Sequence, residues 1–382
     1  YSNTAGTQTT INPALNFNDG TSNVEALINV RGGTTGILNG VLAANGLTKF
    51  GGGTLNLTAN NSTLAGTVSL NGGTLQAFGP TATGNHSPAG TGQILLNGGQ
   101  LNLRSNATTA VAYTLQNTGV TLGQGIPTAT IDVNRGDAAS ANLTLTINPA
   151  AAGGAGLVLS GSPGEQGQTL NLIGGNGYAL AFGSNAANSI SGNATIHTAS
   201  ANLTLNNAPT ITGTNPVISK SGANTWIVGS VTGAPSVAAG TKVVLNEGTL
   251  EMRSITAFGS GTTTSFELNR GTLNLRRDST GTYGGAVGTA YNLTVNGNST
   301  ISADRASGTG DIVEGLGAVT VNSNSILTTS NGNGVVLELA SLALRGNGLL
   351  NIGSSSVTTQ DSGTKITGAV SGGSMIRAGG GF

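Results

Sequence analysis

Histidines are the residues whose chemistry is easiest to recognise in a sequence, and this chain has two. His86 and His197 lie far apart in the sequence, and no Asp or Glu lies close to either of them. A zinc site or a Ser-His-Asp triad needs several such groups in a defined geometry. We therefore expect both histidines to be ordinary surface or loop residues, and we expect no catalytic residue, no metal ligand and no bound cofactor.

Carboxylates give the strongest candidate for catalysis. Asp304-Arg305, Asp311 and Glu314 form the densest acidic stretch of the chain. Parallel β-helices often degrade polysaccharides, using clustered Asp and Glu with Lys or Arg along a groove. This stretch is rich in Gly and Ser, which favours a solvated loop. We expect a loop and no enzyme activity, and a polysaccharide-degrading β-helix is the least favoured of three functions.

Two arginine motifs and one glycine motif each have a functional and a structural explanation. Residues 276–278, Arg-Arg-Asp, could bind an acidic sugar, and residues 135–137 are the integrin-binding tripeptide Arg-Gly-Asp. A solvated corner explains the first match more simply, and a turn explains the second. Residues 174–177 begin like a calcium-binding β-roll repeat, but the Asp that this repeat requires is missing. None of these motifs gives a site residue.

The composition favours a folded β architecture and excludes several function classes. Gly accounts for 64 of the 382 residues, charged residues make up 7%, and 14 Lys and Arg balance 14 Asp and Glu. The chain thus lacks the basic surface that nucleic-acid binding requires. It also lacks an apolar run long enough to cross a bilayer, so we expect no membrane span. It contains no Cys, which excludes disulfides and thiolate metal sites.

A short phrase recurs along the chain and predicts a turn followed by a strand. The phrase is Asn-x-Gly, then Thr or Gln, then Leu, and Asn and Gly both tolerate the left-handed backbone of a corner. After it, Leu alternates with Thr or Asn, the period of a strand with one buried face. The regular recurrence of these leucines predicts one β-solenoid rung per phrase. We expect equivalent corners at Asn71-Gly72, at Asn97-Gly98, at Asn246 with Gly248 and at Asn269 with Gly271. We expect burial of Leu55, Leu75, Leu101, Leu250 and Leu273.

The sequence also contains a repeat of longer period, which includes several copies of the short phrase. The segment that contains Lys49 matches those that contain Lys220 and Arg377, at two similar intervals. The three segments are 47–55, 218–226 and 375–382. This predicts one continuous β-solenoid over residues 1–382. Its tandem units would span approximately 46–216 and 217–373, and a third unit would start at 374–382.

Residues 46–78 resemble the autotransporter-associated β-strand repeat, also called the passenger-associated transport repeat. The family pattern begins Leu-Thr-Lys-x-Gly-x-Gly-Thr-Leu-x-Leu and ends on Gly-Thr-Leu. Ala59 departs from it at an inner Gly, and Trp226 stands at a Leu in the more degenerate second copy, 216–252. The resemblance implies a large, secreted, right-handed parallel β-helix on a bacterial surface, and it implies no activity. The matching residues are Leu47, Thr48, Lys49, Gly51, Gly53, Thr54, Leu55, Leu57, Thr58, Asn61, Gly66, Val68, Gly73, Thr74 and Leu75.

We therefore expect an all-β, right-handed parallel β-helix with rungs of roughly 20–26 residues, the size of one solenoid repeat. The expected function is that of a non-catalytic structural component of a secreted bacterial surface fibre or stalk built by β-helix stacking. The alternative is a passenger-type adhesin that binds carbohydrate or a host ligand through inter-rung loops, such as 80–91 and 305–314. The expected location is extracellular, at the bacterial cell surface.

The expected partners are neighbouring copies or further repeats, joined end to end. The first ten residues contain no charge and no Pro, and the last five are Ala-Gly-Gly-Gly-Phe. Neither end therefore carries a recognisable cap for the open strand edges of a terminal rung. Pairing with a following rung would satisfy those edges.

Overall fold

The computed structural model is all-β, with parallel strands stacked as a β-solenoid of about 12 turns. The chain divides into two compact units, Tyr1–Asn207 and Ala208–Phe382, which we call unit 1 and unit 2. The tandem copies predicted from the sequence, 46–216 and 217–373, are defined by repetition of sequence and not by compactness, and they remain a prediction. The described part of the chain contains no helix long and apolar enough to cross a membrane. The structure describes residues 6–79, 86–106, 113–115, 119–137, 142–149, 152–161, 167–229, 235–285, 289–308, 310–353, 363–372 and 374–377.

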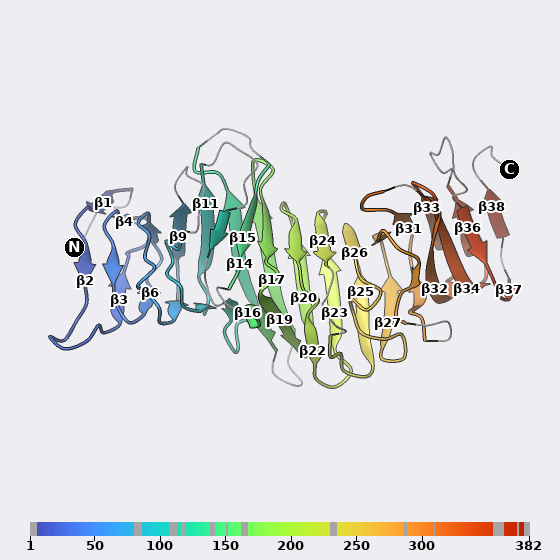
Figure 1. Ribbon diagram of the computed structural model, residues 1–382, viewed down its shortest axis with the longest axis horizontal. Helices are drawn as coiled ribbons and strands as arrows, with labels where there is room; N and C mark the ends of the chain where they lie inside the picture. The colour runs from blue at the N-terminus through green and yellow to red at the C-terminus, as the bar shows by residue number, and fades with distance from the viewer. Residues whose placement is uncertain are drawn as a thin grey trace. The chain divides into compact units, whose positions relative to one another are not determined.

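Unit 1 is built of three parallel sheets and one short extra pair (Figure 1). The first sheet runs, in pairing order, through β3 (Ala26–Asn29), β6 (Leu47–Phe50), β8 (Val68–Leu70), β10 (Ile94–Leu96), β13 (Val120–Leu122), β16 (Gly154–Ser160) and β19 (Ala186–Ser191). The second runs through β1 (Gln8–Ile11), β4 (Thr35–Leu38), β7 (Thr54–Leu57), β9 (Thr74–Gly79), β11 (Gln100–Ser105), β14 (Thr128–Asn134), β17 (Gln168–Gly174) and β20 (Ala194–Thr198). The third runs through β12 (Tyr113–Leu115), β15 (Thr144–Ile147), β18 (Ala179–Phe182) and β21 (Leu203–Leu205), and β2 (Leu15–Asn16) pairs with β5 (Leu42–Ala43).

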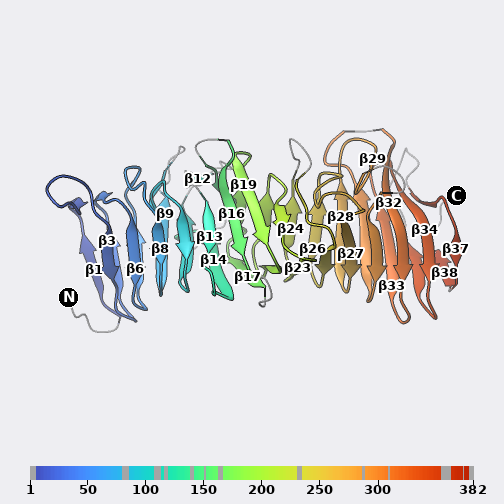
Figure 2. The same ribbon diagram turned by 90° about the horizontal axis from the view of Figure 1, so that it is seen from below.

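Unit 2 is built mainly of two parallel sheets, whose strands stack side by side in Figure 2. The first runs through β23 (Val217–Ser221), β25 (Thr241–Leu245), β27 (Thr264–Leu268), β30 (Asn292–Val295), β32 (Ile312–Val321) and β34 (Val335–Leu344). β36 (Gly363–Ile366) and β37 (Val370–Ser371) both pair with β34, and β29 (Gly281–Thr282) pairs with β32. The second sheet runs through β24 (Thr225–Val228), β26 (Thr249–Met252), β28 (Gly271–Arg276), β31 (Ser299–Asp304), β33 (Ile326–Asn331), β35 (Leu349–Ile352) and β38 (Ser374–Arg377), and β22 (Thr210–Thr212) precedes both sheets in the chain.

The interior of each unit follows from the alternation of the strands. The predicted core leucines are confirmed, because Leu55 is 1% exposed and Leu75, Leu101, Leu250 and Leu273 are 0% exposed. Unit 2 adds a column of buried rings, in which Trp226, Phe258, Phe266 and Tyr291 follow one another at centroid distances of 5.6, 5.8 and 4.8 Å. Each turn buries its apolar residues against its neighbours, so stability comes from stacking rather than from single turns.

The length of a rung varies with the loops that the chain inserts. Thr54 lies beside Thr74 in register, and Thr249 lies beside Thr272. These two rungs fall within the predicted range. Between β14 and β17, Thr130 lies beside Asn171, so that rung is about twice as long as the first. The inserted loop therefore lengthens this turn while β14 and β17 stay in register.

The recurring Asn phrase forms corners that repeat within each unit. In unit 1, the Asn97 side-chain amide donates to Asn71 Oδ1 at 3.1 Å. In unit 2, Asn269 donates to Asn246 at 2.8 Å, Asn296 donates to Asn269 at 3.1 Å, and Asn322 donates to Asn296 at 2.7 Å. The corners at Asn71 and Asn97 are therefore equivalent to each other, as are those at Asn246 and Asn269. The prediction that all four are equivalent is wrong, because the first two precede β9 and β11 and the last two follow β25 and β27, four strands of one sheet.

A buried lysine fixes each of two corners from the inside. Lys49 Nζ donates to the carbonyl oxygens of Gly51, Gly53 and Gly72 at 2.6, 2.6 and 2.8 Å. Its side chain is fully buried, and burial lowers its pKa to about 8. Because Gly72 belongs to the following corner, the ammonium group joins two successive turns.

Lys220 repeats this arrangement in unit 2. Its Nζ donates to the carbonyl oxygens of Ser221, Gly222 and Glu247 at 2.8, 2.7 and 3.0 Å. It too is fully buried, with its pKa lowered to about 8 by burial. The repeated lysine of the sequence is therefore a structural residue.

Candidate functional site

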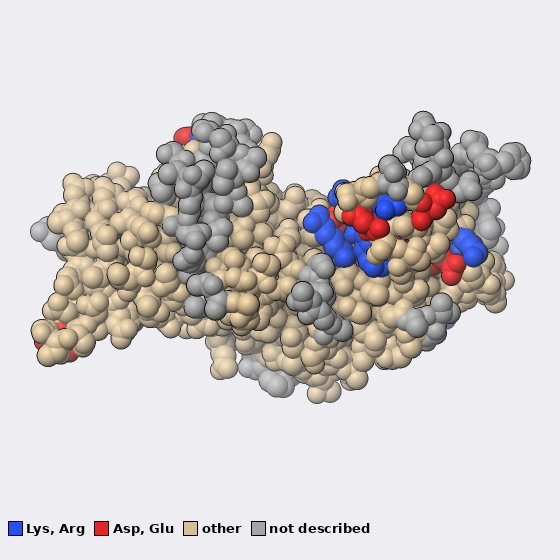
Figure 3. All heavy atoms as spheres, in the orientation of Figure 1, with Lys and Arg blue, Asp and Glu red and all other residues tan. Residues whose placement is uncertain are grey.

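Charged side chains gather on one face of unit 2 (Figure 3), although charge is scarce elsewhere in the chain. Three neighbouring strands of the second sheet, β26, β28 and β31, bring most of them together, because Arg276 lies beside Asp304 in register. Glu314 comes from β32. We call this set the charged corner: Glu251, Arg253, Arg276, Arg277, Asp278, Asp304, Arg305, Asp311 and Glu314.

The outer part of the charged corner is an ion-pair network centred on Glu251. This residue is 5% exposed, and its carboxylate accepts from Arg253 Nε at 2.6 Å. Arg276 Nη1 lies 3.7 Å from its other oxygen, which also accepts from the Asn274 amide at 3.1 Å. One carboxylate thus balances two arginines at the surface. Its oxygens are occupied by protein donors.

A second set of contacts ties two loops together. Asp278 accepts from the backbone N–H and the hydroxyl of Ser307, both at 2.7 Å, and these bonds lower the pKa of Asp278. Arg305 donates to the carbonyl oxygens of Ser307 and Asp278, both at 3.2 Å, and to that of Gly310. Asp304 accepts from Asn333 at 2.7 Å. These charges order loops rather than face an open groove.

Glu314 forms the inner part of the charged corner. It is fully buried in β32, and its Oε1 accepts from the backbone N–H of Arg277 at 3.1 Å and, weakly, from the Tyr283 hydroxyl at 3.5 Å. Its Oε2 has no hydrogen-bond partner among the residues that the structure describes. Burial raises the pKa of Glu314 to about 8, and Arg277 opposes that rise. At acidic to neutral pH, Glu314 is therefore a neutral carboxylic acid inside the fold.

Tyr283 and Arg277 cover this carboxyl group. Tyr283 is fully buried and donates to the carbonyl of Met252 at 3.1 Å, and burial raises its pKa well above the usual value. The Arg277 guanidinium lies 5.9 Å from the centre of the Tyr283 ring and donates to Ser279 at 2.8 Å. A Cβ at Gly281 would overlap Arg277 Nη1, so any larger residue there would displace the guanidinium.

The predicted acidic loop is only partly a loop. Residues 305–308 and 310–311 lie between β31 and β32, and Asp311 is exposed. The expectation is wrong for Asp304, the last residue of β31, and for Glu314, which belongs to β32. The alternation Ile312, Glu314, Leu316 already places Glu314 on the buried face, and this signal could have been read from the sequence. Tyr283 carries no such signal.

The other candidate residues lie apart from the charged corner. His86 is half-buried, with its pKa lowered by burial, and His197 lies on β20 beside Asn171. The Arg135 side chain is 5% exposed and forms an ion pair with Asp137. The Arg-Gly-Asp tripeptide therefore pairs with itself and has a structural role. Among the described residues, no group of three His, Cys, Asp or Glu could hold a metal ion.

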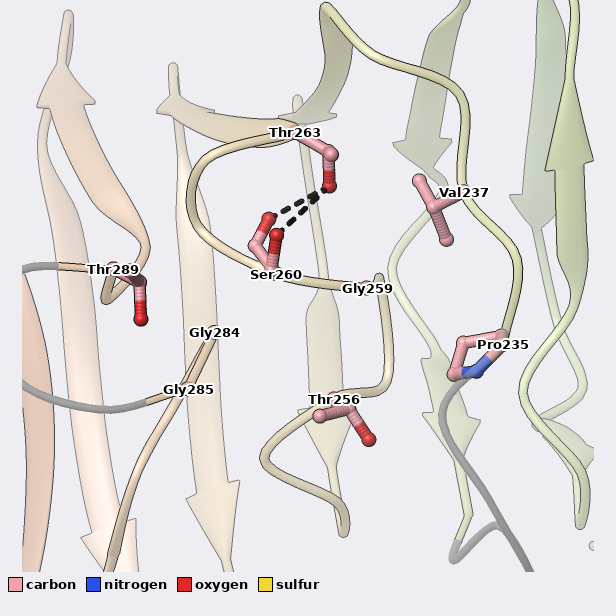
Figure 4. Close-up of a pocket in the computed structure, with 9 residues that line it drawn as sticks. All are labelled: Pro235, Val237, Thr256, Gly259, Ser260, Thr263, Gly284, Gly285 and Thr289. Atoms are coloured by element: carbon pink, nitrogen blue, oxygen red, sulfur yellow. Dashed lines mark hydrogen bonds between the residues drawn. The ribbon is translucent and has the colours of Figure 1, made fainter.

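A shallow pocket of about 360 Å³ lies where loops of successive turns of unit 2 meet (Figure 4). Its wall carries hydroxyl groups and small apolar groups. Thr263 donates to the carbonyl of Ser260 at 2.9 Å, and the two side-chain oxygens lie 3.4 Å apart. Such a wall suits a small neutral group. The lining residues are Pro235, Val237, Thr256, Gly259, Ser260, Thr263, Gly284, Gly285 and Thr289.

Comparison with protein-family models, with curated proteins and with solved structures found no match to this chain.

Proposed function

We propose that this chain is a non-catalytic structural component of a secreted bacterial surface fibre or stalk. The observation that carries the proposal is the repetition of neutral residues at the outward positions of the stack. Thr225, Thr249, Thr272, Thr300 and Thr328 lie beside one another on five successive strands of unit 2. A neutral face that repeats from turn to turn suits a body that supplies length. The resemblance of residues 46–78 to the passenger-associated repeat supports the extracellular location.

Labelling of the producing bacteria tests this proposal. Antibodies against the chain, detected by immunogold electron microscopy on intact cells, are expected to decorate material that extends from the cell surface. The control is the same labelling after deletion of the gene. Label that appears only in permeabilised cells would contradict the proposal.

The charged corner favours a second candidate function, an adhesin that binds carbohydrate or a host ligand. Arg253 and Arg276 are accessible cations there, with side chains 39% and 36% exposed. An acidic sugar could exchange with Glu251 for these two guanidinium groups, because bidentate pairing with carboxylate is what Arg does best.

A glycan array tests the adhesin. Arg253→Gln with Arg276→Gln is expected to remove binding of acidic glycans, whereas Lys242→Gln is expected to leave it. Lys242 is a suitable control because it is also exposed and paired, with Glu267 at 2.7 Å, on another sheet. Absence of binding by the wild-type chain would leave the structural role as the better proposal.

A further inference from the structure

Residues 277–285, which include β29, run alongside the start of β32 at the charged corner, and we call this segment the strap. The hydroxyl of Thr280 accepts from the backbone N–H of Val313 at 3.1 Å. The backbone N–H of Tyr283 donates to the carbonyl of Gly315 at 2.8 Å, and that of Gly284 donates to the carbonyl of Ile255. The strap therefore holds to β32 by bonds on both sides of Glu314.

Glu314 lies beneath the strap and is bonded to it. Oε1 of the carboxyl group accepts from the Arg277 backbone N–H of the strap, and the Tyr283 hydroxyl, whose one proton is donated to the nearer Met252 carbonyl, lies 3.5 Å from the same oxygen. Oε2, which has no hydrogen-bond partner among the described residues, can carry the proton of the neutral acid without disturbing these contacts. In this arrangement, burial of the carboxyl group avoids the large desolvation penalty of a charge only while the group is neutral.

The surroundings of Glu314 offer little compensation for a negative charge. On the strap, Arg277 favours the charge, and no ion pair between Arg277 and Glu314 occurs among the described contacts. The Arg277 backbone N–H and the Tyr283 hydroxyl on the strap also favour the charge, whereas Asp304 on β31 disfavours it, and burial outweighs all of these. On β34, the register neighbour is the buried Leu337, while Glu338 pairs with Lys365 at 3.1 Å.

We propose that Glu314 is a proton-dependent latch, which holds the strap against β32 when its carboxyl group is protonated and releases the strap when the carboxyl group ionises. Opening the strap admits water to the carboxylate and removes the desolvation that burial imposes. Opening the strap also displaces Asp278, whose hydrogen bonds with Ser307 connect the strap to the next loop. The latch therefore controls the exposure of two loops of the charged corner.

The direction and range of the pH dependence follow from linkage. The carboxyl group has a pKa of about 8 beneath the closed strap and an ordinary pKa of 4.5 once it is solvated. Between these two values, opening releases one proton, so the opening equilibrium constant rises about tenfold for each pH unit. Below about 4.5 and above about 8 it is constant. The strap is thus tightest in acid.

Hydrogen exchange of the strap amides, followed by mass spectrometry of the full chain between pH 5.5 and 7.5, tests the latch. Amide hydrogen exchange is base-catalysed, so its rate rises about tenfold per pH unit even when the opening equilibrium of the strap is constant. If the latch operates, the opening equilibrium contributes about another tenfold per pH unit. The logarithm of the wild-type rate is therefore expected to rise with pH with a slope near two. In Glu314→Gln, which cannot ionise, the expected slope is one.

Two further variants keep the test specific. Glu338→Gln removes a carboxylate on the neighbouring strand that is 26% exposed, and it should keep the slope of two. Tyr283→Phe removes the hydroxyl that bonds to the Met252 carbonyl and contacts Glu314, and it should raise the rate at every pH without changing the slope. A wild-type slope of one, or a slope of two that persists in Glu314→Gln, would overturn the proposal.

Discussion

At the residue scale, Lys49 and Lys220 show how a charge can serve inside a nearly uncharged protein. Each ammonium group has three N–H donors, and three backbone carbonyls accept them at 3.0 Å or less. A corner turns carbonyl oxygens inward. That of Gly53 also accepts from the backbone N–H of Thr74 at 3.1 Å, and leaving the others unbonded would destabilise the fold. Lysine supplies the donors on a flexible stem that fits the apolar interior.

Replacing Lys220 by Met should destabilise unit 2 by about 3 kcal/mol, because three inward carbonyls lose a charged donor. The measurement is the free energy of unfolding from urea titration. The matched control is Lys242→Met on the neighbouring strand, whose ion pair with Glu267 is exposed and should contribute less than about 1 kcal/mol. Equal losses in the two variants would show that the corner lysine has no special role.

Substitution of two glycines of unit 1 distinguishes the cost of backbone strain from the cost of steric overlap. Gly73 and Gly125 have φ angles of +63° and +73°. A Cβ at Gly73 would overlap the Gly53 oxygen and lie 2.5 Å from Lys49 Nζ, whereas a Cβ at Gly125 would meet nothing within 4 Å. Gly125→Ala should destabilise by about 1–2 kcal/mol through strain alone, and Gly73→Ala should destabilise by at least about 2 kcal/mol more, because the corner must move. Urea titration of the two variants measures the difference, and similar losses would mean that the corner relaxes easily.

At the element scale, the asparagine corners act as ladders that run across turns. Asn269 is an internal member of the ladder in unit 2, since it donates to Asn246 and accepts from Asn296. The side-chain nitrogen of Asn269 donates to the preceding turn, and its side-chain oxygen accepts from the following turn. A ladder of this kind has a direction, and a residue that can only accept interrupts it.

Asn269→Asp should therefore destabilise unit 2 by about 1–2 kcal/mol, because a carboxylate would face the Asn246 oxygen without a proton to share. Asn298→Asp is the control. The Asn298 oxygen accepts from the backbone N–H of Ile326 at 3.1 Å, and the carboxylate preserves that bond. Thermal unfolding followed by circular dichroism at pH 7 compares the two. A larger loss in Asn298→Asp would contradict the ladder.

The strands and corners could be predicted from sequence because their signals are local. Leu alternation and Asn-x-Gly phrases lie within a few residues of each other, and the burial of Leu75 or Leu250 follows from them. The strap could not be predicted. Arg277, Tyr283 and Glu314 meet because inserted loops of particular lengths stack β29 on β32, and no local pattern encodes that meeting.

At the scale of the whole molecule, each unit is a series of turns that exchange the same kinds of contact. In unit 1, Thr35, Thr54 and Thr74 are register neighbours on β4, β7 and β9. Removing one whole turn should therefore bring two equivalent turns together. Removing one residue fewer would reverse which side chains face inward, because strand side chains alternate.

Deletion of residues 54–73, which removes one whole turn, should leave unit 1 folded with a cooperative thermal transition. Deletion of residues 54–72, which is one residue shorter, should abolish that transition, since the strand after the junction would present its polar face to the core. Far-ultraviolet circular dichroism and the melting curve distinguish the two outcomes. Loss of folding in both variants would show that individual turns of this unit are not interchangeable.

The unequal lengths of the turns also have a mechanical consequence. Hydrogen bonds between successive parallel strands point along the stacking direction, so tension applied in that direction loads one interface between turns at a time. Each turn that detaches then releases its own contour length, about 70 Å for the turn from Thr54 to Thr74 and about 140 Å for the turn from Thr130 to Asn171, at roughly 3.4 Å per residue. Under load, unit 1 would lengthen in discrete steps of unequal size, and the inserted loops would set how much energy each step absorbs.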